Sequence, residues 1–243
     1  MKIALIGYGK MGKTIEQLSV ERGHEIVARI GKADAKPEFL NGCDVIIEFT
    51  TPESAFENVS HYLKQGLPVV CGTTGWNAQL KDAEQLAQQH ETAFFYASNF
   101  SIGVNLFFEI SKKMSALLSE WPEYNLRIEE THHIHKKDKP SGTAITLAQH
   151  VISNNHNLEQ WQVLEDEINP NNTLPIIAHR ENEVFGNHSL IAENDIDIIE
   201  LKHIAKNRHG FALGAILAAE FIQNKKGFFG MSDLIKQKLA HGI

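Results

Sequence analysis

The chain has 243 residues, of which 42% are hydrophobic, enough to bury a core as one large domain or two small ones. Its formal net charge of −7 argues against general nucleic-acid binding, but a local basic cluster can still bind an anionic small molecule. The two cysteines make no disulfide framework, and no run is long enough to span a membrane. The N-terminus does not have the pattern of a signal peptide, so we expect a cytoplasmic protein.

The first hundred residues alternate short apolar runs with stretches of helical spacing. The pattern predicts strands at 2–6, 24–30, 44–49, 68–71 and 93–97, and helices at 10–21, 54–65 and 77–90. Strands that alternate with helices indicate a parallel, doubly wound sheet. We therefore predict an α/β fold whose N-terminal domain is Rossmann-like and binds a dinucleotide.

The pattern changes after residue 100. Helices are predicted at 105–118, 143–153 and 210–223 and from Met231, strands at 125–135, 175–177, 183–192 and 197–205, and a polar loop at 169–175. The short alternating strands indicate an α+β domain with a mixed or antiparallel sheet. We predict a dinucleotide-binding domain of residues 1–103, to which 211–243 return, and a substrate-binding domain of residues 104–210.

The stretch GYGKMG places Gly7, Gly9 and Gly12 between the first strand and the first helix. In this context the first glycine allows a tight turn, the second lets a pyrophosphate approach the backbone, and the third lets helix and strand pack closely. The helix N-terminus adds amides that attract phosphate. An ordinary glycine turn is the alternative.

The choice of dinucleotide depends on the residues after the second strand. An acidic residue there would bind the ribose hydroxyls of NADH, but the chain has Gly31 followed by Lys32. This favours NADPH, or acceptance of both cofactors. Asp34 keeps NADH possible. That Lys32 is simply a solvated loop residue is nearly as good an interpretation as a contact with NADPH.

Two further loops lie at the carboxyl ends of predicted strands, where open α/β sheets bind ligands. They are CGTTGW at 71–76 and ASNFSIGVN at 97–105. Their small residues would let the backbone approach a nicotinamide ring. Each could also be a plain strand-to-helix loop.

The segment THHIHKKDKPSGTA, residues 131–144, concentrates positive charge in an acidic chain. His132 and His135 could be a metal pair, but no cysteine or carboxylate set completes the spacing, so we expect no metal. The lysines could be a solvated run, which is the favoured interpretation for Lys137 and Lys139. The Ser-Gly-Thr turn could cap a helix or bind a carboxylate at its N-terminus.

This segment, extended to Glu130, resembles the signature of bacterial 4-hydroxy-tetrahydrodipicolinate reductases, also called dihydrodipicolinate reductases. GYGKMG, EFTTPES, GTTG, ASNFSIGVN, GNHS and IELKHIAKNRHGFALGA extend the resemblance over nearly the whole chain. It implies that NADPH or NADH reduces a dicarboxylate, (hydroxy-tetrahydro)dipicolinate, to tetrahydrodipicolinate in lysine and diaminopimelate biosynthesis. It also implies a homotetramer built through the sheets of the second domain.

The resemblance also implies residue roles. His132 would donate or accept a proton, Lys136 would be the second proton donor, and His133 would contact the substrate. Residues implied to hold a substrate carboxylate are Gly142 and Thr143, with Ser141 beside them. Residues implied to bind the dinucleotide are Gly7, Gly9, Lys10, Met11 and Gly12, with Lys32 added from the loop above, and on the nicotinamide side Gly72, Thr73, Thr74, Ala97, Ser98, Asn99 and Phe100.

Some positions depart from the family pattern. Thr131, Lys139 and Asn187 do so without affecting the chemistry. Gly31 and the short connection at 31–43 leave the cofactor preference open. A different Rossmann oxidoreductase acting on another acid, and a binding protein without activity, remain alternatives.

Histidine suits proton transfer because its ordinary pKa lies near neutrality. Nearby lysines should favour neutral His132, whereas bound carboxylates should favour its charged form, so the substrate would help to load the proton. Consecutive His132 and His133 should face opposite sides of a strand unless the strand ends there. Because cofactor and substrate groups fall in different domains, we expect domain closure to assemble the site.

Overall fold

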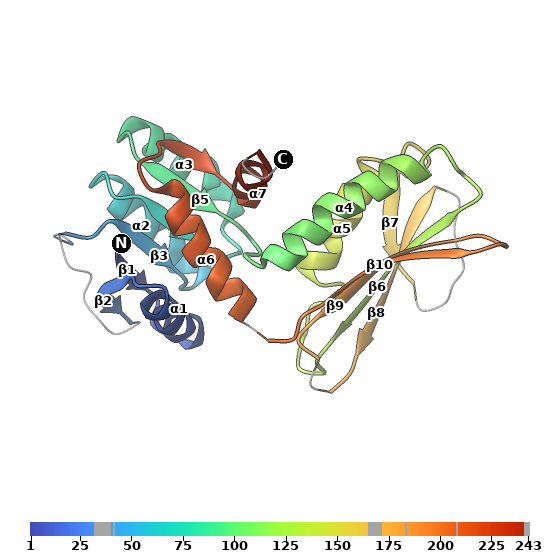
Figure 1. Cartoon of the computed structure of the whole chain (residues 1–243), viewed down its shortest axis with the longest axis horizontal. Coiled ribbons are helices and arrows are strands. Elements are labelled where there is room, and N and C mark those ends of the chain that lie inside the picture. Colours follow the sequence, from blue (N-terminus) through green and yellow to red (C-terminus); the bar gives the residue numbers. More distant parts are fainter. Residues whose placement is uncertain (32–39, 41, 165–171, 183, 208, 241–243) are drawn as a thin grey trace. The chain divides into compact units, whose positions relative to one another are not determined.

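A computed structural model describes residues 1–31, 40, 42–164, 172–182, 184–207 and 209–240. The chain divides into two compact units (Figure 1). Unit 1 consists of Met1–Ile102 and His209–Ile243, and unit 2 of Gly103–Arg208. No helix in the described part of the chain is both long enough and apolar enough to cross a membrane.

Unit 1 is built on a six-stranded parallel sheet with the order β11-β5-β4-β3-β1-β2. Its strands are β1 (Lys2–Ile6), β2 (Glu25–Ile30), β3 (Val45–Glu48), β4 (Val69–Cys71), β5 (Ala93–Tyr96) and β11 (Gly227–Phe229). Its helices are α1 (Lys10–Glu21), α2 (Pro52–Leu63), α3 (Leu80–Gln89), α6 (His209–Ile222) and α7 (Met231–Ala240), with a 3₁₀ turn at Asn77–Gln79. The predicted parallel, doubly wound sheet is confirmed.

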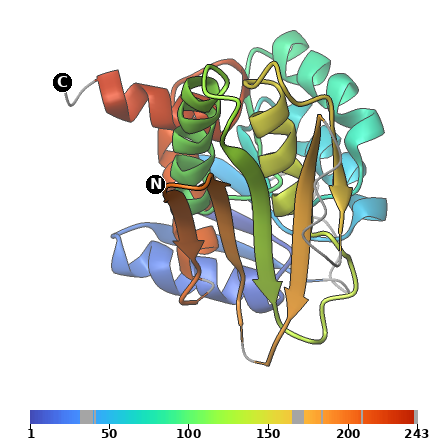
Figure 2. The same cartoon turned by 90° about the vertical axis from the view of Figure 1, so that its right-hand side faces the viewer.

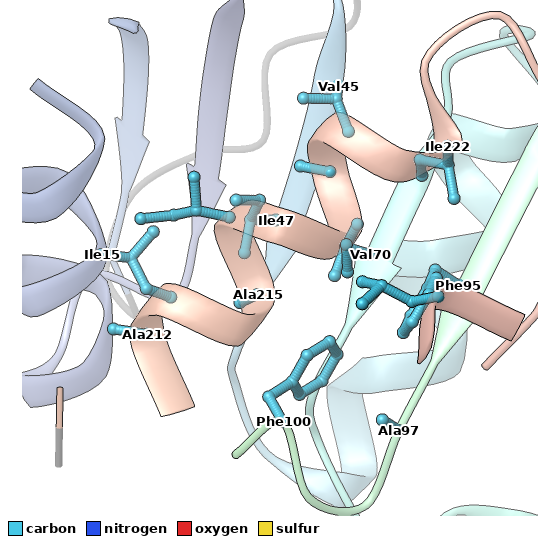
Figure 3. Packing of buried hydrophobic residues seen from close by; sticks show 14 of the residues in the cluster. Ile15, Val45, Ile47, Val70, Phe95, Ala97, Phe100, Ala212, Ala215 and Ile222 are labelled. Carbon is cyan, nitrogen blue, oxygen red and sulfur yellow. The ribbon is translucent and has the colours of Figure 1, made fainter. Parts of the chain in front are cut away.

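The inner strands of this sheet are mostly apolar because helices cover both of its faces. On one face α1, α6 and α7 pack against residues such as Val45, Ile47 and Phe95 (Figure 3). On the other face α2 and α3 bury a second cluster that includes Ile46 and Phe94. Each fully buried large aliphatic or aromatic side chain contributes about 1.5–3 kcal/mol, so burial on both faces stabilises the strands from which the loops of the candidate site extend.

Unit 2 has a five-stranded mixed sheet with the order β10-β9-β6-β8-β7 (Figure 2). Its strands are β6 (Asn125–His132), β7 (Gln160–Val163), β8 (Thr173–Arg180), β9 (Asn187–Glu193) and β10 (Ile198–Ile204). β6 pairs in parallel with β8 and antiparallel with β9. The helices α4 (Ile102–Leu118) and α5 (Gly142–Ile152) share one apolar cluster with one face of this sheet.

Several predicted boundaries were wrong. The strand predicted at 125–135 ends at His132, and the helix predicted at 77–90 begins with the 3₁₀ turn. The loop predicted at 169–175 is strand from Thr173 onwards, and residues 165–171 lie outside the described part. The strand predicted at 175–177 extends to Arg180, and the one predicted at 183–192 begins at Asn187. The strands β7 and β11 were not predicted, because each has too few residues to show a period.

Candidate functional site

The three glycines after β1 occupy the positions that their predicted roles require. Gly7 has φ +98°, and a Cβ there would lie 1.9 Å from the carbonyl oxygen of Phe49, so only glycine fits. A Cβ on Gly12 would lie 2.4 Å from the Gly7 carbonyl oxygen, which shows how closely α1 approaches the loop. A Cβ on Gly9 would meet nothing within 4 Å, so the backbone at the N-terminus of α1 is open to a ligand. This arrangement suits a phosphate.

Two adjoining cavities surround this loop in unit 1, with volumes of about 430 and 370 Å³. They share Gly9, Phe49 and Thr50 in their walls. The larger is also lined by Gly7, Tyr8, Ile30, Gly31, Ser54 and Asn58, among others. The smaller is also lined by Lys10, Met11, Gly12, Gly72, Thr73 and Thr74, among others. The structure thus brings eight predicted cofactor residues together, and paired cavities of this size suit the two halves of a dinucleotide.

The loop after β5 lies differently. Ala97 and Phe100 belong to the buried apolar cluster of this unit, and the Phe100 ring packs against Phe49 and Phe95 (Figure 3). Ser98 is exposed and Asn99 is half-buried. None of these four residues lines either cavity. Lys32 and Asp34, on which the choice of cofactor depended, lie outside the described residues.

A buried polar cluster lies at the end of β6 in unit 2. Glu130 and His132 are two residues apart on this strand, so both side chains point to the same face of the sheet. His188 on β9 pairs in register with Glu130, and its ring lies against that of His132 with the centroids 5.0 Å apart. All three residues are more than nine-tenths buried. Gly186 borders the cluster, since a Cβ there would lie 3.0 Å from Nε2 of His132.

Glu130 is the anionic centre of this cluster. Its Oε1 accepts a hydrogen bond from the backbone N–H of Ser141 at 3.0 Å and pairs with the Arg180 guanidinium at 3.3 Å. Its Oε2 lies 3.4 Å from Nδ1 of His132 and 3.6 Å from Nε2 of His188. Burial alone would raise the pKa of Glu130, but the contacts with His188 and Ser141 outweigh it and lower that pKa to about 2. Glu130 is therefore a carboxylate at neutral pH.

His132 is neutral at the same pH. Its pKa is lowered to about 4, first by burial, then by the charges of His188, Lys136 and Arg180, while Glu130 acts in the opposite direction. Lys136 lowers the pKa of His132, as expected for the lysines, but the effect of burial on that pKa is larger. For the neutral ring to take up a second proton, a further negative charge must lie close to it, such as that of a bound anion.

The remaining candidates of the basic segment follow His132 and differ in how far they are buried. Because β6 ends at His132, His133 is not held to the opposite face of the sheet, and it is half-buried. Lys136 is half-buried, and its Nζ lies 2.8 Å from the Asp138 carboxylate. Lys137 and Lys139 are exposed, as expected for a solvated part of the run.

The predicted carboxylate cradle forms the start of α5. Ser141 is the N-cap of this helix, and its Oγ accepts a hydrogen bond from the backbone N–H of Ala144 at 3.1 Å. Gly142 is exposed and Thr143 half-buried in the first turn. The predicted alternatives, a helix cap and an anion site, are compatible here, because the cap bonds one amide of the first turn and the positive end of the helix dipole can still attract an anion.

Of the histidine pair considered for a metal, His132 is buried, whereas His135 is exposed and its ring lies 6.2 Å from that of His133. Glu130, His132 and His188 do hold ligand-type atoms within 4.8 Å of one another. However, the Arg180 guanidinium on the same carboxylate opposes a further cation. The geometry favours a site for protons and anions.

Three residues of this cluster were given no role from the sequence: Glu130, Arg180 and His188. Glu130 could have been found, because a carboxylate two positions before His132 must share its face of the strand. Arg180 and His188 lie in the cluster because their strands, distant in the sequence, pair with β6, and no local pattern shows such pairing. Arg180 is the register partner of His132, but the strand that carries it was predicted too short.

Comparison with known proteins decides the family. Residues 1–100 match the family described as "Dihydrodipicolinate reductase, N-terminus", and residues 103–235 match "Dihydrodipicolinate reductase, C-terminus". The chain belongs to the dihydrodipicolinate reductase family. The predicted resemblance is confirmed, and membership makes the chain an oxidoreductase whose N-terminal region is a dinucleotide-binding domain. A nicotinamide dinucleotide is thus its reductant.

Individual members of the dihydrodipicolinate reductase family resemble the chain over nearly its full length. A 4-hydroxy-tetrahydrodipicolinate reductase of Christiangramia forsetii is 45% identical over 237 residues, which cover 97% of this chain and 98% of the relative. One of Thermosipho africanus is 34% identical, covering 98% and 99%. A solved structure, a dipicolinate-bound dihydrodipicolinate reductase of Paenisporosarcina sp. TG-14, has the same fold with a TM-score of 0.78, 24% identity and coverage of 95% and 97%.

The low pKa of His132 predicts an acid-sensitive fold. A histidine whose pKa is about 4 when folded and 6.5 when unfolded contributes stability above pH 6.5, which is lost as the pH falls toward 4. The loss reaches about 3 kcal/mol. Urea unfolding at pH 7 and at pH 4.5 should show a larger drop in the free energy of unfolding for the wild type than for His132→Gln. Equal drops in the two proteins would contradict this cause.

Proposed function

We propose that the protein reduces 4-hydroxy-tetrahydrodipicolinate to tetrahydrodipicolinate with NADPH or NADH, in the biosynthesis of diaminopimelate and lysine. The observation that carries the proposal is the buried His132, paired with the Glu130 carboxylate close to the N-terminus of α5. This cluster combines a proton carrier with an anion site, as reduction of a cyclic dicarboxylate requires. The matches of both regions to the family support the same reaction.

Different residues of the chain bind the cofactor and the substrate in this proposal. Gly7, Gly9 and Gly12 hold the dinucleotide phosphates, and the nicotinamide, when bound, supplies a hydride. The first turn of α5, with Gly142 and Thr143, binds one substrate carboxylate. His133 contacts the substrate.

His132 delivers the proton that balances the hydride, and Lys136 is the second proton donor. Binding of the dianionic substrate raises the pKa of His132, because opposite charge then adds to that of Glu130. The bound substrate thus favours the protonated form of its own proton donor.

A spectrophotometric assay tests this function. Freshly prepared dihydrodipicolinate should cause loss of nicotinamide absorbance in the presence of the protein and NADPH or NADH. No oxidation of either nucleotide would overturn the proposal. Comparing the two nucleotides in the same assay decides the cofactor preference, which we expect to favour NADPH or to accept both, because Gly31 lines the larger cavity where an acidic residue would bind NADH.

The protein functions, in this proposal, as a cytoplasmic homotetramer. Both cysteines are free and buried, which suits a reducing compartment. The helices α4 and α5 pack against one face of the unit 2 sheet through the apolar cluster. The opposite face presents apolar side chains on the edge strand β10. Ile198 and Ile204 on that strand are 59% and 56% exposed, which suits contact with a second copy.

Replacing Ile198 by lysine should therefore weaken the tetramer. A buried charge at a subunit contact is costly unless it is paired, so smaller species should appear in sedimentation velocity. Leu117→Lys is the matched control, because Leu117 is 72% exposed but lies on α4, away from this face. A tetramer that tolerates Ile198→Lys, or that is lost equally in both variants, would contradict this interface.

A further inference from the structure

Glu48 is a carboxylate with 0% exposure at the carboxyl end of β3, in the middle of unit 1. It interrupts the apolar run that forms this strand. A buried charge costs several kcal/mol unless hydrogen bonds replace its water. Its partners therefore explain why the fold retains it.

Four donors surround this carboxylate. Its Oε1 accepts from Thr50 Oγ1 and, at 3.3 Å, from Asn58 Nδ2. Its Oε2 accepts from Thr73 Oγ1 at 2.7 Å and from Cys71 Sγ at 3.0 Å. Burial and the nearby Glu48 raise the pKa of the Cys71 thiol, so it stays protonated and donates. An ionised carboxylate has about four lone-pair sites and no donor, so all of its capacity is used.

These partners join two loops. Thr50 lies after β3 and Thr73 after β4, and the backbone N–H of Thr50 also donates to Thr73 Oγ1 at 2.7 Å. Thr50 lines both cavities, Asn58 the larger and Thr73 the smaller, whereas Glu48 lines neither. The carboxylate therefore fixes cavity walls from behind, without facing the space where a ligand binds.

We propose that Glu48 is a positioning residue of the cofactor site, which holds the loops after β3 and β4 at the spacing that the dinucleotide requires. This inference rests on the proposed function, because it assumes that the paired cavities bind the nicotinamide nucleotide. For this role, both side-chain oxygens of Glu48 must accept hydrogen bonds. A glutamine would have the same shape but would turn an NH₂ group toward two donors, whose present hydrogen bonds to the carboxylate would be lost, so the link between the loops would weaken.

Isothermal titration of Glu48→Gln with NADPH and NADH tests the inference. We expect the Kd of the preferred nucleotide to rise about tenfold, as loss of one buried hydrogen-bond partner predicts. The Kd of dipicolinate should stay unchanged, since that ligand addresses unit 2. Ile222→Ala is the control for lowered stability, because Ile222 is fully buried in the same unit and lines neither cavity. Its nucleotide Kd should equal that of the wild type.

Glu48→Asp keeps the acceptor-only chemistry and should recover part of the lost affinity. If Glu48→Gln does not fold, Thr73→Val removes the link between the loops and should weaken nucleotide binding in the same way. Wild-type affinity in whichever of these two variants folds would overturn the positioning role. A wild-type protein that binds neither nucleotide would instead overturn the proposed function.

Discussion

Replacing His132 by glutamine is expected to lower kcat by about 10²–10⁴-fold, the usual contribution of a general acid or base. Glutamine keeps a polar side chain of similar reach but cannot carry the proton. Nucleotide affinity should not change, because the dinucleotide residues belong to unit 1. His135→Gln is the matched control: it lies three residues further along the same segment, it is exposed, and its replacement should leave kcat unchanged.

The same variant decides when His132 receives its proton. Its pKa of about 4 leaves the free protein without that proton at neutral pH, so binding of a dicarboxylate should draw one from the solvent. Titration with dipicolinate near pH 7, in buffers of different ionisation enthalpy, should show proton uptake by the wild type and by His135→Gln but not by His132→Gln. Uptake retained in His132→Gln would assign the proton to another group, and an unchanged rate and pH dependence would remove His132 from the mechanism.

The sequence was most informative where structure is local. The glycine loop combines a strand, three glycines and a helix start within eleven residues, and each glycine meets the steric condition predicted for it. The apolar runs of unit 1 were identifiable because parallel strands are buried on both faces. Of the two loops predicted at the carboxyl ends of strands, the one after β4 lines the smaller cavity, whereas the one after β5 lines neither, because Ala97 and Phe100 are buried in the apolar cluster.

Unit 2 was less predictable because its site depends on distant pairings. The motif at the end of β6 pointed to His132 and Lys136 as candidates, but not to the groups that set the charge of His132. Arg180 reaches the site through the parallel pairing of β8 with β6, and His188 through the antiparallel pairing with β9. Register between strands so far apart in the chain depends on tertiary packing, so a local motif points to the proposed proton donor but not to its surroundings.

Replacing Glu130 by glutamine should affect both stability and catalysis. Removing one partner of a buried ion pair leaves the other charge uncompensated, here on Arg180, and typically costs 3–5 kcal/mol, so we expect a loss of about that size. Glu130 is also the contact that raises the pKa of His132, so kcat should fall by about 10²-fold and proton uptake on dipicolinate binding should shrink. Glu109→Gln, which breaks a half-exposed pair with Lys112 on α4, should change neither by much.

A double variant separates the two roles of Glu130. In Glu130→Gln/Arg180→Met the unpaired guanidinium is gone, so part of the lost free energy of unfolding should return. The rate should not return with it, because His132 still lacks the carboxylate 3.4 Å from its Nδ1 that favours the charged ring. Recovery of kcat together with stability would show that Glu130 only holds the fold. Recovery of stability alone would show that this carboxylate, two positions before His132 on the same strand, determines whether His132 can hold the proton that the reaction needs.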